Sequence, residues 1–140
     1  MSNTTHSSAQ VIKLLFSTET LEPRPTAWYV AAHTGEPGID AADNEVSTSS
    51  DANYARQPIE FELSVASGIT SAMNDADILF PVSAAEGNYT VQALSIHTAA
   101  TGGIALAVLP LNPPRVIQPS GIPLRFPINE IIIEGFSCDD

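Results

Sequence analysis

The residues best able to do chemistry in this chain are its three histidines, and their spacing predicts neither a metal site nor a catalytic one. His6 lies in a polar N-terminal stretch, whereas His33 and His97 end two apolar segments. Metal binding and nucleophilic catalysis need partners at defined spacing, and the sequence has no His-x-His, His-Glu-x-x-His, Cys-x-x-Cys or Gly-x-Ser-x-Gly pattern. We therefore expect no catalytic, cofactor-binding or metal-ligating residue and no enzyme activity, and interpret these histidines as tolerated at strand ends.

Carboxylates suggest two further kinds of chemistry. Glu60 and Glu62 are two residues apart, so on one strand they share a face, as a glycosidase's paired carboxylates could. An amphipathic strand with a solvated face accounts for both without a reaction, and we prefer that interpretation. Acidic loops can also bind calcium, but the spacing here lacks the EF-hand pattern, so we interpret them as solvated charge. These loop residues are Asp40, Asp43, Glu45, Asp51, Asp75 and Asp77.

Composition excludes several classes of partner. The chain has 140 residues, with 5 basic and 16 acidic side chains, which gives a formal net charge of −11. Proteins that hold nucleic acid need clustered cations, and an anionic membrane surface repels such a charge. No apolar run is long enough to span a bilayer. We therefore expect no nucleic acid, no membrane and no small-molecule substrate as a partner.

A single cysteine, Cys138, makes an intrachain disulfide impossible, and the N-terminal residues do not match the pattern of a secretion signal. These two features lead us to expect synthesis in a reducing cytoplasm.

Hydrophobic periodicity predicts an all-β fold. Val11, Leu14 and Leu15 have helical spacing, which predicts a short helix over residues 7–16 capped by Ser7 or Ser8. The remaining apolar segments are short, often alternate with polar residues, and are separated by turns rich in Gly, Pro and Asn. We expect an antiparallel, jelly-roll-like sandwich of about eight strands with a short N-terminal helix and an extended N-terminal arm. Residues 1–8 would form the flexible arm and 9–140 a single β-sandwich domain. The expected strands cover 27–33, 56–65, 69–73, 78–82, 89–98, 104–109, 115–117, 122–126 and 128–134.

Several strings resemble a family of small bacteriophage virion proteins that often carry the label tail-fibre protein. The ordered strings are AWYVAAHT (27–34), NEVS (44–47) with YARQ (54–57), ILFP (78–81), AAEGNYTVQALSIHTAATGG (84–103) and PLRFPINEIII (123–133). An aspartate that usually precedes AATGG in the family is replaced by His97-Thr98 here. We expect the hairpin to survive this change because Gly102-Gly103 supplies its turn. Within the group, length, charge and architecture are most similar to the jelly-roll capsid cement, or decoration, protein of a tropism-switching short-tailed phage.

The resemblance implies a capsid cement protein that is made in the host cytoplasm and binds the major capsid protein on the outer capsid surface of the virion. It also implies self-association, as a homodimer, for which the aliphatic edge over 128–133 is a candidate. Residues 1–8 and the loop 35–55 are candidate segments that become ordered along neighbouring subunits. The alternative is a tail-fibre or baseplate-associated protein that binds a host receptor or other tail proteins. A receptor-binding module would need an exposed aromatic platform, for which the candidates are Trp28, Tyr29, Tyr54 and Tyr89.

Overall fold

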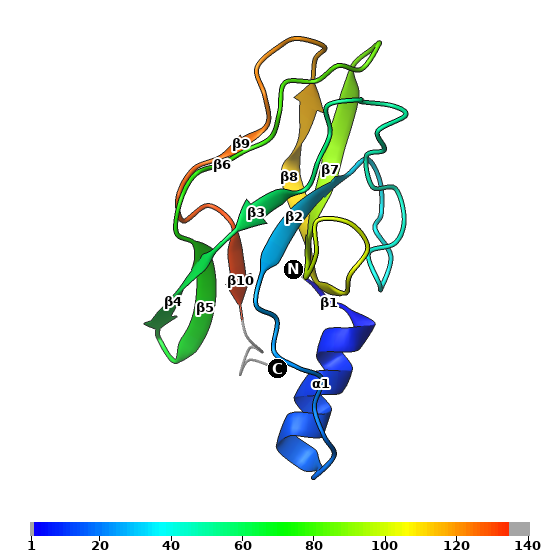
Figure 1. Cartoon of the computed structure of the whole chain (residues 1–140). Coiled ribbons are helices and arrows are strands. Elements are labelled where there is room, and N and C mark those ends of the chain that lie inside the picture. Colours follow the sequence, from blue (N-terminus) through cyan, green and yellow to red (C-terminus); the bar gives the residue numbers. More distant parts are fainter. Residues whose placement is uncertain (1, 135–140) are drawn as a thin grey trace.

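The computed structural model describes residues 2–134, and in this part of the chain one helix accompanies antiparallel β-sheets (Figure 1). The first elements are β1 (Ser2–Asn3), α1 (Thr5–Phe16), β2 (Trp28–His33), β3 (Gln57–Ile59), β4 (Phe61–Ala66) and β5 (Ile69–Asn74). They are followed by β6 (Ile78–Leu79), β7 (Tyr89–His97), β8 (Ala105–Ile117), β9 (Arg125–Phe126) and β10 (Ile132–Glu134). The predicted all-β class with one short N-terminal helix is therefore confirmed.

Three sheets make up the sandwich. The largest has the order β1-β8-β7-β2-β3, a second has the order β10-β5-β4, and β6 pairs with β9 in a two-stranded ribbon. The chain neighbours β2 and β3, β4 and β5, and β7 and β8 pair directly, each antiparallel. The other pairs, β2 with β7, β1 with β8, β5 with β10 and β6 with β9, join strands far apart in the chain, as expected for an antiparallel sandwich.

The hydrophobic core lies between the five-stranded sheet and the β6–β9 ribbon. One face of the sheet contributes Val30 from β2 and Leu94 and Ile96 from β7, while Ile78 and Phe126 enter from the ribbon. All of these side chains are buried, and their burial supplies the main driving force for the fold. Residues 44–46 of the loop 35–55 run along the edge of β2, where His33 bridges Glu45 and the Val46 N–H donates to the Ala32 carbonyl, and the site described below lies there.

Two predicted strands have different boundaries in the structure. The segment 56–65 divides at Glu60 into β3, which pairs with β2, and β4, which pairs with β5 in another sheet. The alternation of residues continues through this break, so periodicity could not locate it. In contrast, 104–109 and 115–117 join into β8, because residues 111–114 bulge between the pairs Ala93–Pro110 and Val91–Arg115 and so accommodate the prolines.

The first residues do not form the expected extended arm. Ser2–Asn3 pair with β8, and the Thr4 hydroxyl donates to the Ala105 carbonyl and also accepts from the Ser7 N–H, which caps α1. The helix therefore begins at Thr5 rather than Ser7, and the boundary expected between residues 8 and 9 falls inside it. The extent of a single domain over 9–140 stays a prediction. No helix in residues 2–134 is long and apolar enough to cross a bilayer.

Candidate functional site

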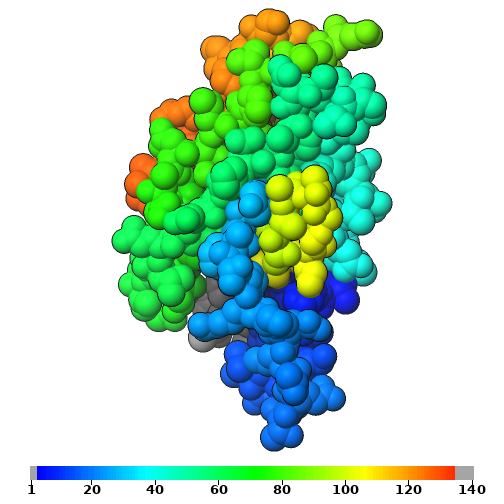
Figure 2. Space-filling model, in the orientation of Figure 1, coloured from blue at the N-terminus to red at the C-terminus, as the bar shows by residue number. Residues whose placement is uncertain are grey.

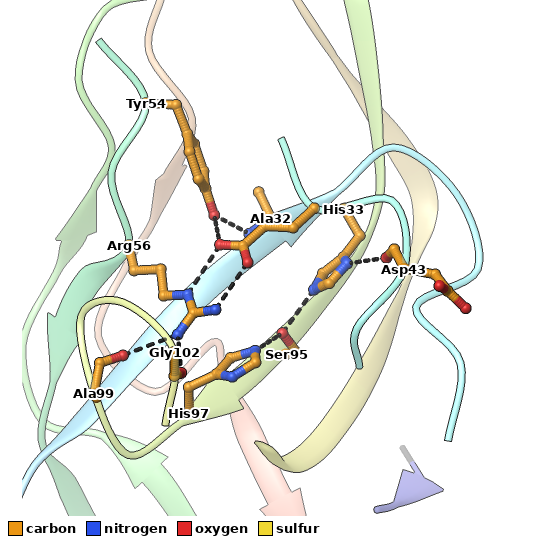
Figure 3. Close-up of polar contacts among 10 residues, drawn as sticks. Ala32, His33, Asp43, Tyr54, Arg56, Ser95, His97, Ala99 and Gly102 are labelled. Carbon is orange, nitrogen blue, oxygen red and sulfur yellow. Dashed lines mark hydrogen bonds and ion pairs between the residues drawn. The ribbon is translucent and has the colours of Figure 1, made fainter. Parts of the chain in front are cut away.

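A chain of hydrogen bonds joins the two strand-end histidines on the face of the large sheet that points away from the hydrophobic core (Figure 3). His33 Nδ1 lies 2.7 Å from the Asp43 carbonyl oxygen, and its Nε2 lies 2.7 Å from Ser95 Oγ. Ser95 Oγ in turn lies 2.7 Å from His97 Nε2. The antiparallel register of β2 with β7 creates this cluster, because it pairs Tyr29 with His97 and Ala31 with Ser95. We call His33, Ser95 and His97 the histidine–serine cluster.

The direction of each proton follows from the carbonyl at one end. A carbonyl oxygen only accepts, so His33 Nδ1–H donates to Asp43 and its Nε2 must accept from the Ser95 hydroxyl. Ser95 Oγ then accepts from His97 Nε2–H, which leaves both rings neutral with no conflict between donors. Burial lowers the pKa of His33, and burial together with the Arg56 charge lowers the pKa of His97 to about 4. All three side chains are buried, so this geometry tethers the loop and presents no nucleophile to a substrate.

Beside it lies a second polar cluster, formed by Glu45, Tyr54 and Arg56 (Figure 3). Arg56 donates from Nε and one terminal nitrogen to the two Glu45 oxygens, at 2.9 and 2.8 Å, in a bidentate ion pair. Its other terminal nitrogen donates to the carbonyls of Ala99 and Gly102, at 3.0 and 2.8 Å. One guanidinium therefore joins the loop 35–55 to the loop 98–104, and we call this group the Arg56 cluster.

The ionisation of the Arg56 cluster is fixed by its own contacts. Burial raises the pKa of the Glu45 carboxyl, but hydrogen bonds from Arg56 and Tyr54 outweigh it and hold that pKa below its usual value. The hydrogen bond to Glu45 raises the pKa of Arg56, and burial strongly raises that of Tyr54. Tyr54 donates to Glu45 and accepts from the Ala32 N–H, so the cluster also holds β2.

Asp51 anchors the far end of the same loop. It accepts hydrogen bonds from the backbone N–H groups of Ala84 and Asn53, at 2.9 and 3.1 Å, and from the Tyr89 hydroxyl at 2.8 Å. Burial raises the pKa of Asp51, but these hydrogen bonds outweigh it and keep the carboxyl ionised. The loop expected to become ordered only on the particle is thus already held by the domain at Asp43, Glu45 and Asp51.

The other candidates from the sequence do not converge on one site. Glu60 and Glu62 are exposed, and Glu60 lies at the break between β3 and β4, so they do not share a face of one strand. Asp77 pairs with Arg125, while Asp40 and Asp75 lie exposed on separate loops. Within residues 2–134, no three His, Cys, Asp or Glu side chains are grouped so that they could hold a metal ion. Cys138 lies outside the described residues.

The four aromatic candidates do not form an exposed platform. Trp28 packs edge-on against Phe61, with ring centroids 6.1 Å apart, and Tyr54 stacks on Phe80 at 6.3 Å. Tyr89 binds Asp51, and Tyr29 is only partly exposed in β2. In the aliphatic segment 128–133, Ile131 is buried and β10 is an edge strand with β5 as its partner.

Sequence reasoning missed both polar clusters. The spacing of two residues that places Ser95 and His97 on one face of a strand was visible in the sequence. The identity of the neighbouring strand, which brings His33 next to Ser95, was not visible. Glu45, Tyr54 and Arg56 belong to NEVS and YARQ, and AATGG supplies the two carbonyls. The strings that carry the resemblance therefore meet in the structure.

The loop 98–104 keeps its shape without the aspartate of the related proteins. The Thr98 hydroxyl accepts a hydrogen bond from the Ile104 N–H at 3.0 Å, which is a role that a carboxylate could also fill. Gly102 and Gly103 have positive φ angles, and a Cβ at Gly103 would lie 2.8 Å from that of Ala99. The predicted glycine turn is thus confirmed.

Fold and site together define an all-β domain in which buried polar clusters pin a long loop to a sheet, the construction of a structural protein. Residues 1–134 match the family model described as Podophage GP4 fiber I protein gp80. The chain belongs to this family, and it is a bacteriophage virion structural protein. No curated protein matches it.

Acid is expected to destabilise the folded chain through the histidine–serine cluster. Both histidines have a folded-state pKa below 6.5, so the unfolded chain binds protons that the folded chain excludes. Stability should fall as the pH drops below 6.5, by at most about 1.4 kcal/mol per pH unit for each histidine. Guanidinium unfolding between pH 7.5 and 5 measures this loss. His97→Gln should reduce it, since one of the two titrations is removed.

His6→Gln is the matched control, because His6 lies on α1 outside the cluster. The pKa values of Glu45 and Asp51 are lowered from their usual values of 4.5 and 3.8, so protonation of these carboxyls affects stability mainly below pH 4.5. They therefore do not account for a loss of stability between pH 7.5 and 5. An unchanged pH dependence in His97→Gln would contradict the assignment.

Proposed function

We propose that this protein is a non-enzymatic structural component of a phage fibre, held on the particle by contacts with other virion proteins. The observation that carries the proposal is the match of residues 1–134 to a family described as a fibre protein. The buried clusters support a structural role, because their polar groups are satisfied within the domain and hold a loop in place.

Exposed apolar side chains support an assembly role. The described residues include exposed aliphatic or aromatic side chains on α1, on β4 and β6, and in the loops after β6 and β8. In a virion protein, such surfaces are buried against neighbouring subunits. They include Ile12, Leu14, Leu15, Phe16, Leu63, Val65, Leu79, Val82 and Ile122.

A capsid cement role is the second candidate, and two observations favour it. Arg56, Arg115 and Arg125 are each paired with a carboxylate of the chain, so a net charge of −11 leaves an acidic surface suited to the outside of a DNA-filled shell. Residues 18–25 also run exposed and without regular structure, as a segment lying along a neighbouring subunit would. In this role the partner would be the major capsid protein.

Particles that lack this protein separate the two roles. For a fibre component, we expect heads of normal heat stability and loss of fibre density in electron micrographs, with the protein located by antibody at the tail. A cement protein would instead cover the head in proportion to its shell subunits, and its loss would lower the temperature at which heads release DNA. That second result would overturn the fibre proposal.

A further inference from the structure

The C-terminal half of α1 is apolar over more than half of its circumference. Five of the six residues from Val11 to Phe16 are apolar, and at 100° per residue they span about 200° of the helix, with Lys13 in the remaining sector. An apolar face this wide is normally buried against another element. Here it buries no residue, and Phe16 is 77% exposed. In Figure 2 the helix and the segment that follows it project from one end of the molecule.

A second apolar surface lies open among residues 2–134. A groove of about 500 Å³ runs between the β10-β5-β4 sheet and the β2, β7 and β8 strands, with Asn3 and Ser7 of the chain's own N-terminal segment also in its lining, and none of its lining residues is charged. Leu63 on β4 forms one wall and is 72% exposed, although it belongs to the apolar face of an amphipathic strand. The other wall includes Trp28, Ile96 and Leu106. We call this surface the apolar groove.

The accessible area of the chain is larger than that of a compact monomer of its mass. The chain exposes 8559 Å², whereas a compact monomer of 14.8 kDa exposes about 7,000 Å². The excess is about 1,600 Å², and each partner in a standard interface loses about 800 Å². A chain that both donates a helix and accepts one loses two such patches.

Charge favours contact through these two surfaces over contact between other faces. Two chains of net charge −11 repel each other across most of their surface. Residues 1–25, however, contain two cations, Lys13 and Arg24, and two carboxylates, Glu19 and Glu22, so their side chains sum to zero. The neutral helix can approach the uncharged groove of another copy without this repulsion.

We propose that the occupant of the apolar groove is helix α1 of a second copy of this chain. An amphipathic or apolar helix in a hydrophobic groove is a common mode of recognition, with side chains at helical spacing as anchors. Leu14, Leu15 and Phe16 are such anchors here. The inference stands independently of whether the protein lies on the tail or the head.

Sedimentation velocity of the full-length chain over a concentration series tests the proposal. We expect reversible self-association, and Leu15→Lys or Leu63→Glu should each raise its Kd about tenfold or more. The double variant, Leu15→Lys with Leu63→Glu in one chain, should restore association, because the new lysine of one copy then meets the new glutamate of another. Both side chains are exposed, so circular dichroism should show a folded chain in every case.

Ile122→Glu is the matched control. Ile122 is 90% exposed, and the loop 118–122 lies at the opposite end of the molecule from α1 (Figure 1), so this change should leave the Kd unaltered. A monomer at all concentrations, association insensitive to both single changes, or a double variant without rescue would each overturn the proposal. Hydrogen exchange of the full-length chain and of a chain that ends at Glu134 gives a further test. If β4 were protected in the full-length chain and lost that protection in the shorter one, residues 135–140 of the same chain would be the occupant, and the proposal would be overturned.

Discussion

Replacing Arg56 with alanine is expected to lower the free energy of unfolding by about 3 kcal/mol, because it removes one partner of a largely buried ion pair. Only 10% of the Arg56 side chain and 25% of Glu45 are exposed. The change would leave the Glu45 carboxylate without its counter-charge and the carbonyls of Ala99 and Gly102 without a donor. Guanidinium unfolding at pH 7.5, fitted for midpoint and slope, measures the loss.

The two other arginine pairs of the β-sheets supply matched controls. Arg115 pairs with Glu130 and Arg125 with Asp77, and all four side chains are substantially exposed. Exposed ion pairs contribute little, so Arg125→Ala should leave the unfolding midpoint nearly unchanged. Arg115→Ala should cost slightly more, because the Arg115 guanidinium also lies 5.1 Å from the centroid of the buried Phe126 ring. Arg56→Lys should be intermediate, since an ammonium cannot form the bidentate pair and reach both carbonyls. If Arg56→Ala matched Arg125→Ala, the Arg56 cluster would not hold the fold.

Hydrogen exchange should place the effect of Arg56→Ala in the loop 35–55. The Val46 N–H donates to the Ala32 carbonyl and the Thr34 N–H to the Asn44 carbonyl, so both amides report whether the loop stays on the sheet. These two amides should exchange faster in the variant. The exchange rates of core amides in β7 should change only as much as the change in the global free energy of unfolding requires. Uniform acceleration would instead indicate general unfolding.

Strands whose partners are close in sequence were predictable. The segments 69–73 and 27–33 marked β5 and β2 correctly to within one residue, and the end of β4 was also placed to within one residue, although its start was merged with β3. The histidines were also placed correctly at the ends of β2 and β7. Periodicity reports which side chains share a face of a strand, and for these elements that was sufficient.

The polar clusters depend on information that periodicity lacks. Arg56 reaches 11 residues back to Glu45 and 43 residues forward to Ala99, and nothing local in YARQ distinguishes it from a solvated arginine. The same reason hid the break at Glu60, where the N–H of Asp75, the residue after β5, donates to the Glu60 carbonyl. Contacts between distant segments become visible only when the sheet order is known, and the sequence pattern left that order open.

Replacing Asn74 with alanine is expected to destabilise the chain by about 3 kcal/mol, because one buried and two partly buried backbone groups would lose their partner. The Asn74 side chain is fully buried. Its amide nitrogen donates to the carbonyls of Ala76 and Pro127, at 2.8 and 2.9 Å, and its oxygen accepts from the Ile131 N–H at 2.8 Å. Sequence reasoning assigned Asn74 only to a turn, yet it connects β5 to the segment before β10.

Asn74→Asp separates the donor role from the acceptor role. An aspartate keeps one oxygen that accepts from the Ile131 N–H. Its second oxygen would face the carbonyls of Ala76 and Pro127, which can only accept, and at pH 7.5 the carboxylate would be a buried charge without a counter-charge. Its defect should therefore shrink between pH 7.5 and 5, as the carboxyl gains a proton that it can donate to one carbonyl. Asp75→Ala, the exposed neighbour, is the control and should leave the unfolding midpoint unchanged. An Asn74→Asp defect independent of pH would contradict this assignment.

The Asn74 contacts also link stability to assembly. Ile133 of β10 lines the apolar groove, and the Ile131 N–H that Asn74 holds lies just before β10. If Asn74 keeps this strand against β5, then Asn74→Ala should weaken self-association under conditions in which the chain is still folded, although Asn74 itself does not line the groove. Sedimentation velocity well below the unfolding temperature measures this effect. Full self-association in a folded but destabilised Asn74→Ala chain would show that β10 does not form part of the contact.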